Sequence, residues 1–139
     1  MTGAISIRRE AAISFLINAA LSLAFFTGTF GLASRPLNWG APGGLAFDFI
    51  PQSAAVALMS ALVPPLLARR HLSGRPLRPV LLRALLLAAG GALLGGLLAF
   101  FTRTNAPIAL PAALILKLVY GGTLGALVTT VALRSLLRP

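Results

Sequence analysis

The chain has 139 residues, of which 58% are hydrophobic and 10% are charged, whereas a soluble domain carries about 25% charged residues. Basic residues outnumber acidic ones by twelve to two, for a net charge of +10, and the mean hydropathy is +0.92. The absence of cysteine excludes disulfides, thiol redox chemistry and thiolate metal sites.

Four apolar stretches follow in chain order, each close to the roughly 20 residues that a membrane-spanning helix needs. They predict spans at residues 11–33, 46–68, 82–102 and 107–131, with a polar loop at 69–81. Because the spans and their connections use nearly the whole chain, we expect a single membrane domain over residues 1–139. The predicted fold class is an all-α integral membrane protein with four transmembrane helices.

The first span follows Arg8 and Arg9, which is also how a secretory signal peptide begins. Its apolar run extends from Ala11 to Ala33, whereas the apolar part of a signal peptide covers about 7–15 residues. We therefore expect this span to be retained, with a signal peptide as the alternative.

Arginine predicts the orientation of the spans. Eight flanking arginines lie on one side of the predicted bundle, whereas Arg35 and Arg103 alone flank the other side. Positive charge in short loops stays cytoplasmic. We therefore expect an inner-membrane protein with both termini and loop 69–81 in the cytoplasm. Anionic lipid headgroups are the expected partners of this basic face. Nucleic-acid binding is not expected, because no base-stacking aromatics interleave with the arginines. The eight are Arg8, Arg9, Arg69, Arg70, Arg75, Arg78, Arg134 and Arg138.

Aromatic residues support the same orientation, because they gather at the predicted outer interface, where aromatic belts form. Here the expected belt is one-sided, since arginine occupies the inner face. Its members are Phe25, Phe26, Phe30, Trp39, Phe47, Phe49, Phe100 and Phe101.

Prolines divide the second span. Pro51 lies in its first turn, where proline is tolerated. Pro64 and Pro65 lie near its cytoplasmic end and are expected to kink or end the helix. Carbonyl groups freed there must bond to neighbours or water. A gate at these prolines is the alternative to a simple helix end.

Small residues recur every four residues in the third and fourth spans, a spacing that lets helix backbones approach closely. We expect them to pack helices within the chain or across a dimer, in preference to lining a pore. The glycines concerned are Gly91, Gly95, Gly96, Gly121 and Gly125.

The chain also contains an internal similarity. Residues 23–29 and 98–104 agree at six of seven positions, at an offset of 75, and both segments end an outward-going span. The returning spans match at an offset of 65, which places Arg69 on Arg134. This pattern is consistent with two tandem helical hairpins related by an axis along the membrane normal. Chance agreement between spans rich in Leu, Ala and Phe is the alternative.

Few polar residues lie inside the spans. Lys117 lies near the middle of the fourth span, where a charge costs about 2.5–3.5 kcal/mol and usually finds a partner. Asp48 is the membrane-embedded acid, and the helical rise places it about 10 Å further out than Lys117. Water or Gln52 would bridge that gap. Together with Tyr120, one turn below Lys117, and Asn18 on the first span, these residues are expected to form a polar path through the bundle.

Three roles remain open for this polar path. It is a clamp that holds the helices in register, a path for an ion or small solute, or a contact with a protein partner. In the solute path, Lys117 attracts an anion or titrates, and Asp48 is its counter-ion or accepts a proton.

Catalytic, cofactor and metal sites are not expected. His71 and Asp48 fall on opposite sides of the predicted membrane, so a Ser/His/Asp arrangement cannot assemble from them. One histidine and two acids are too few for a zinc site within one chain. We therefore expect a protein that is not an enzyme.

In size and span number the chain is similar to the small multidrug-resistance transporters, which rely on a membrane-embedded glutamate in the first span. Here Glu10 precedes the apolar core, so no family is assigned. The leading prediction is a homo-oligomeric channel or transporter for a small solute, with an anion favoured by Lys117. The alternative is a non-transporting accessory or assembly subunit of a larger membrane complex.

Overall fold

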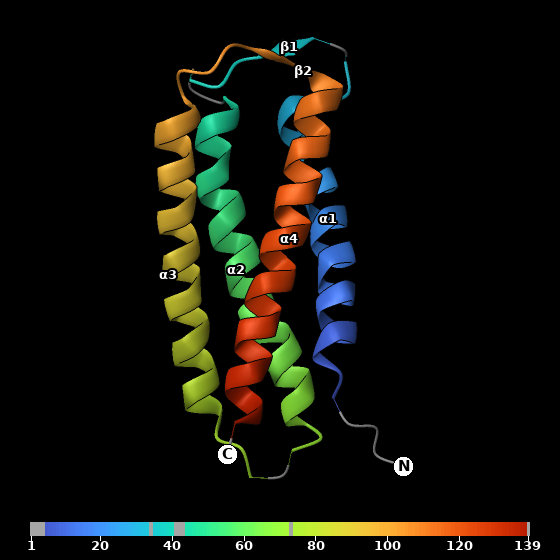
Figure 1. The fold of residues 1–139 in the computed structure, drawn as a ribbon, viewed down its shortest axis with the longest axis vertical. Coiled ribbons are helices and arrows are strands. Elements are labelled where there is room, and N and C mark those ends of the chain that lie inside the picture. Colours follow the sequence, from blue (N-terminus) through green and yellow to red (C-terminus); the bar gives the residue numbers. More distant parts are fainter. Residues whose placement is uncertain (1–4, 34, 41–43, 73, 139) are drawn as a thin grey trace.

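The computed structural model describes residues 5–33, 35–40, 44–72 and 74–138, and within them it forms a bundle of four long helices (Figure 1). Each of these helices is long and apolar enough to cross a membrane, which confirms the prediction of four helices of that length and hydropathy. Their bounds are Ile7–Phe30 for α1, Leu45–Arg69 for α2, Leu77–Thr102 for α3 and Leu110–Leu137 for α4.

Local signals set the two ends of α1. The Ser6 hydroxyl accepts a hydrogen bond from the Arg9 amide at 3.3 Å, as a helix N-cap does. Gly31 adopts a φ of 73° and donates its amide to Thr27, which ends the helix at Phe30. The expected span to residue 33 is therefore too long, because the left-handed conformation favours glycine and stops the helix there.

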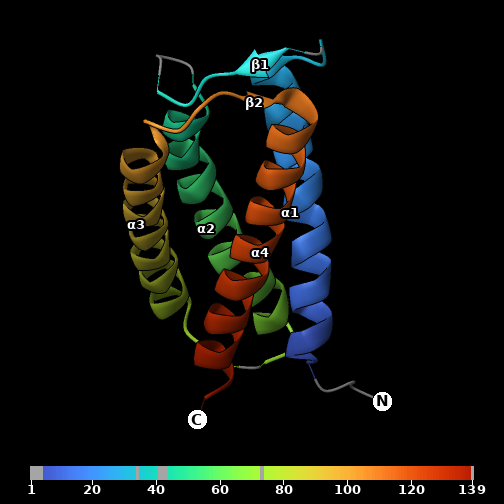
Figure 2. The ribbon, with the colours of Figure 1, turned by 45° about the horizontal axis from the view of Figure 1, so that its top comes forward.

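A short antiparallel ladder closes one end of the bundle, where β1 and β2 lie side by side (Figure 2). Strand β1 is Pro36–Leu37 and strand β2 is Ile108–Ala109, with Pro36 opposite Ala109 and Leu37 opposite Ile108. The sequence predicts no strands and assigns residues 108–109 to the fourth span, which is wrong. The reason is Pro111, which favours the first turn of a helix and so starts α4 at Leu110.

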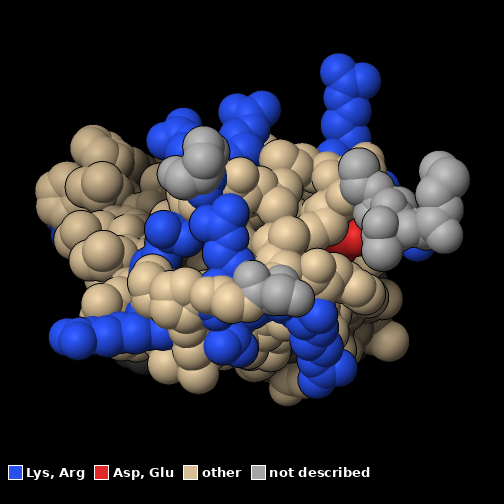
Figure 3. Space-filling view, turned by 90° about the horizontal axis from the view of Figure 1, so that it is seen from below, with Lys and Arg blue, Asp and Glu red and all other residues tan. Residues whose placement is uncertain are grey.

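The other end of the bundle is basic. Helices α3 and α4 extend beyond their predicted spans, since α3 starts at Leu77 instead of residue 82 and α4 runs to Leu137 instead of residue 131. The connection between α2 and α3 is correspondingly shorter than the expected loop 69–81. Viewed from this end, Lys and Arg side chains surround the face of the bundle (Figure 3).

The sequence predicts a kink or a helix end at Pro64 and Pro65; helix α2 continues through both prolines to Arg69, so they do not end it. Pro64 has no amide hydrogen to give to the Ser60 carbonyl, four residues earlier. The Thr129 hydroxyl of α4 donates to that carbonyl instead, at 3.3 Å. A neighbouring helix thus supplies the hydrogen bond that the proline removes, which lets the helix continue.

Helices that follow each other in the chain are not always the ones that pack together. Helix α2 packs most extensively against α3, α1 packs against α4, and α2 crosses α4 in the middle of the bundle. The consecutive pairs α1–α2 and α3–α4 make few contacts. Each end strand therefore joins two helices that make few contacts with each other.

Half of the predicted aromatic belt is core. Trp39 follows β1, is buried, and stacks on Phe49 with ring centroids 6.4 Å apart. The ladder and the loops bring these rings inside the bundle, which the linear sequence does not indicate. The buried members are Phe26, Phe30, Trp39 and Phe49, whereas the outward-facing ones are Phe25, Phe47, Phe100 and Phe101.

The glycines differ in what they face. A Cβ on Gly91 would lie 2.6 Å from the Ala57 Cβ, and one on Gly95 would lie 2.8 Å from the Ile50 Cα, so α2 and α3 touch through their backbones. Gly96 is different, because nothing lies within 4 Å of its Cβ position. Gly96 therefore packs no helix within the chain, since it lies one residue off the interface, and packing across a dimer stays a prediction for it.

Candidate functional site

The first turn of α2 surrounds the ammonium group of Lys117, which projects from α4. The Lys117 Nζ donates a hydrogen bond to the Leu45 carbonyl at 2.9 Å and lies 3.3 Å from the Asp48 Oδ2. It also lies 3.4 Å from the centroid of the Phe49 ring, a cation–π distance. A carbonyl, a carboxylate and an aromatic face therefore hold one cation.

Burial is unequal within this ion pair. The Lys117 side chain is 1% exposed, whereas that of Asp48 is 20% exposed. The direct contact corrects the expected gap between them. A lysine stem leans toward the N-terminus of its own helix, which brings the ammonium group up to the start of α2.

Tyr120 and Gln52 extend this group by one turn. The Tyr120 hydroxyl forms a hydrogen bond with the Ser53 hydroxyl, and its ring meets Phe49 edge-on at 5.0 Å. The Gln52 Nε2 donates to the Lys117 carbonyl and to the Ser22 hydroxyl, both at 3.1 Å. Gln52 thus bonds to the backbone of the lysine and not to its ammonium group. We call Asp48, Lys117, Gln52, Ser53 and Tyr120 the outer layer.

A second polar cluster lies deeper in the bundle, around Asn18. The Asn18 Nδ2 donates to the Ser14 carbonyl at 2.8 Å and to the Ser60 hydroxyl at 3.0 Å. The Thr129 and Ser14 hydroxyls share a hydrogen bond at 2.7 Å. These residues, which we call the inner layer, come from α1, α2 and α4 and connect the three helices.

Glycines of α4 make the room for these polar side chains. A Cβ on Gly125 would lie 2.6 Å from the Asn18 Cγ, and one on Gly121 would lie 3.1 Å from both the Ser22 Cβ and the Gln52 Nε2. Gly121 and Gly125 therefore face polar side chains of α1, unlike Gly91 and Gly95 of α3, which mainly face the backbone of α2.

The two layers form one polar seam between α1, α2 and α4. Ser22 connects them, since it bonds to Gln52 in the outer layer and lies one turn from Asn18 in the inner layer. The structure thus brings Asp48, Gln52 and Lys117 together, with Tyr120 adjoining, and places Asn18 in a separate cluster.

Sequence reasoning missed the hydroxyl residues of the seam. On α1, Ser14, Asn18 and Ser22 recur every four residues and so share one face of the helix. This spacing can be read from the sequence and would have indicated the two serines. The missed residues are Ser14, Ser22, Ser53, Ser60 and Thr129.

Some polar atoms of the seam lack a partner. Within the described part of the chain, the Asn18 Oδ1 and the Gln52 Oε1 are buried and accept no hydrogen bond. Buried polar groups in proteins are almost always satisfied by protein or ordered water. The seam therefore has two open acceptor positions, one in each layer.

No match was found on comparison with protein-family models, curated proteins and solved structures. The functional argument consequently depends on the geometry of the seam.

Proposed function

We propose that this protein is a multi-pass transport protein of the cell inner membrane that moves a small anionic solute past Lys117. The observation that carries the proposal is a lysine 1% exposed inside a bundle of apolar helices. Ionisable residues inside membrane spans usually face the bundle interior and mark solute or proton paths.

Stability alone is a weak reason for such an ion pair. Replacing a buried pair by apolar residues of similar volume is often neutral or stabilising, because desolvation offsets the attraction between the charges. The hydrogen bonds of the inner layer already connect α1, α2 and α4, so an ion pair is not needed to hold these helices in register. The Lys117–Asp48 pair is better explained by a use for the charge.

The unequal burial suggests how the charge is used. Asp48 is the more exposed partner, so it is the group that an incoming anion would replace on Lys117. The Leu45 carbonyl and the Phe49 ring hold the ammonium group in place during that exchange. In this mechanism the ion pair is the closed state, and the solute competes with Asp48.

The proposed orientation places both termini in the cytoplasm and the outer layer in the periplasmic half of the membrane. It rests on the arginines, which gather at the end opposite the ladder (Figure 3). Anionic lipid headgroups are the proposed partners of that end.

We further propose that the chain is a tandem repeat of two hairpins. Exchanging α1 with α3 and α2 with α4 maps the extensive α2–α3 interface onto the extensive α1–α4 interface, and the sparse consecutive pairs onto each other. The same exchange maps the two pairs of the ladder onto each other. Helices α2 and α4 start at Leu45 and Leu110, which keeps the offset of 65 seen in the sequence.

The repeat would place the ion pair at a meaningful position. At the offset of 65, Lys117 corresponds to Gln52, and these two residues touch through the Gln52 amide and the Lys117 carbonyl. Transporters built from repeats often carry their substrate site at the interface between the repeats. Lys117 would then occupy in the second hairpin the position that Gln52 occupies in the first, with a charged side chain in place of a neutral one.

The test is anion flux in reconstituted vesicles, with chloride, acetate and phosphate as probes. Lys117→Met should abolish flux of the transported anion, whereas Arg103→Gln, which removes one positive charge outside the bundle, should leave it unchanged. The Arg103 guanidinium lies over the Phe100 ring, 4.2 Å from its centroid, away from the seam. Equal flux in the wild type and in Lys117→Met would refute the role of Lys117.

An accessory or assembly subunit of a larger membrane complex is the second candidate. The observation in its favour is that Lys117 is already held by a carbonyl, a carboxylate and a ring, a closed arrangement that needs no solute. Purification from the native membrane in mild detergent separates the two. Recovery as a homo-oligomer favours transport, and a fixed ratio to an unrelated protein favours the accessory role.

A further inference from the structure

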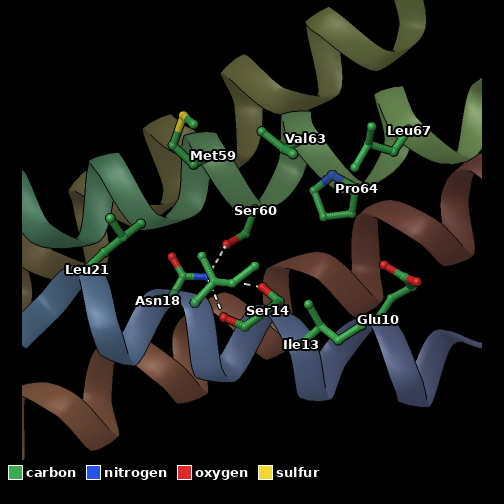
Figure 4. Close-up of a pocket in the computed structure, with 11 residues that line it drawn as sticks. Glu10, Ile13, Ser14, Asn18, Leu21, Met59, Ser60, Val63, Pro64 and Leu67 are labelled. Carbon is green, nitrogen blue, oxygen red and sulfur yellow. Dashed lines mark hydrogen bonds between the residues drawn. The ribbon is translucent and has the colours of Figure 1, made fainter.

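A cavity of about 210 Å³ opens between α1 and α2 at the level of the inner layer. It lies where these two helices make few contacts, although they follow each other in the chain. We call it the α1–α2 groove (Figure 4). Its walls are mainly apolar and include Ile13, Ile17, Leu21, Met59, Val63 and Leu67.

One polar atom of the groove has no partner. Asn18 is 4% exposed, and its Nδ2 donates to the Ser14 carbonyl and the Ser60 hydroxyl. Because a carbonyl oxygen only accepts, the amide nitrogen must face Ser14, which fixes the orientation of the amide. The Oδ1 accepts no hydrogen bond within the described residues. Figure 4 shows it turned away from Ser14 and Ser60, between Leu21 and Met59.

This free acceptor determines what chemistry fits. A buried acceptor without a donor costs about 1–3 kcal/mol, and in hydrocarbon no bulk water is present to satisfy it. The charged residue of the groove is Glu10, which lies two turns from Asn18, about 12 Å along the helix. An ammonium group at Asn18 would therefore have no counter-charge beside it, whereas a neutral hydroxyl supplies the donor without a charge.

The size and position of the groove fit a small lipid-soluble molecule. A cavity of about 150 Å³ holds a benzene molecule, so this larger one holds a ring or a short alkyl chain. The α1 and α2 walls include side chains that are also exposed on the lipid-facing surface, such as Ile17 and Met59. Entry from the membrane is therefore direct.

We propose that the α1–α2 groove binds a neutral, membrane-dissolved alcohol. Its hydroxyl donates to the Asn18 Oδ1, and its alkyl part lies between the apolar walls of α1 and α2. This site is distinct from the Lys117–Asp48 pair and does not require transport, so a binding assay reads it whether or not the protein carries an anion.

The experiment uses the full chain in lipid nanodiscs and a photoreactive octanol, with labelled residues mapped by mass spectrometry. Labels are expected on groove residues such as Met59 and Ile17. Unlabelled 1-octanol should compete about tenfold better than octyl methyl ether, which has no donor, since one hydrogen bond separates them. Equal competition, or labels confined to other helices, would overturn the proposal. An absence of labelling would mean that water alone fills the cavity, and would also overturn it.

Variants locate the contact. Asn18→Leu should abolish the advantage of octanol over the ether, and a persisting advantage would contradict the assigned acceptor. Because this change also removes the bonds to Ser14 and Ser60, a second variant leaves the amide intact. Met59→Trp fills the groove from α2 and should remove the label, whereas Leu93→Trp, on the exposed face of α3, should keep it. Labelling that survives Met59→Trp would refute binding in the groove.

Discussion

Two adjacent glycines of α3 offer a matched test of the packing between α2 and α3. Gly95 and Gly96 differ in what an added methyl group would meet. A Cβ on Gly95 would lie 2.8 Å from the Ile50 Cα and 2.9 Å from the Phe49 carbonyl carbon, whereas a Cβ on Gly96 meets nothing within 4 Å. We predict that Gly95→Ala destabilises the bundle and Gly96→Ala does not.

The magnitude follows from those distances. Ordinary van der Waals contact begins near 3.4 Å, so Gly95→Ala leaves a shortfall of about 0.6 Å to the Ile50 Cα. The atoms in the way are backbone, so the helices must move apart instead of a side chain turning aside. Overpacking of this kind costs about 1–3 kcal/mol. Both variants gain the same helix propensity, about 1 kcal/mol at most, so the difference between them isolates the packing cost.

Reversible unfolding in mixed micelles, by titration with sodium dodecyl sulfate, measures this difference. The single tryptophan of the chain, Trp39, stacks on Phe49, and the Cβ of Gly95→Ala would press on the backbone at Phe49. Its fluorescence therefore reports the end of the bundle that the variant disturbs. Unfolding of the two variants at the same detergent fraction would refute the close contact of α2 and α3 at Gly95.

Further predictions concern the ion pair, the topology and the outer layer. Asp48→Asn should destabilise the protein more than Lys117→Met, because it leaves the fully buried Lys117 charge without its counter-ion. The double variant should recover most of the loss in the same titration. An equal loss in both single variants would contradict the unequal burial of the pair. Because the chain lacks cysteine, His71→Cys and Asn105→Cys are clean topology probes, and a membrane-impermeant thiol reagent should label Asn105→Cys alone from the periplasm. Tyr120→Phe removes the partner of the Ser53 hydroxyl and should cost about 1 kcal/mol in the unfolding titration, whereas no change would mean that the bond is absent.

The helices were predictable from the sequence, and their ends were less so. Length and hydropathy are properties of consecutive residues, so each of the predicted spans overlaps one of the helices described. The ends depend on particular residues, such as Gly31, which stops α1, and Pro111, which starts α4. The continuation of α2 through Pro64 depends on Thr129, which lies far away in the sequence, and no local pattern indicates it.

The candidate site was predictable in its charges but not in its arrangement. Lys117 and Asp48 stand out in any apolar sequence, because a charge inside a span is costly. Their direct contact follows from how α2 and α4 cross, which is a property of the packed bundle. The serines were missed for a different reason, since a hydroxyl inside a span is cheap and common, and only its partner makes it informative.

The proposed repeat explains why the polar seam lies on one side of the bundle. At the α2–α3 interface, Gly91 and Gly95 lie against the backbone of α2, which leaves no room for a side chain at these two positions. In the related α1–α4 interface the glycines lie on α4, where Gly121 and Gly125 face polar side chains of α1. The proposed repeat relates α3 to α1 and α2 to α4. The glycines lie on α3 in the first interface and on α4 in the second, so they do not lie on corresponding helices. The glycines of α4 leave room for polar side chains, so the proposed solute path runs between α1, α2 and α4.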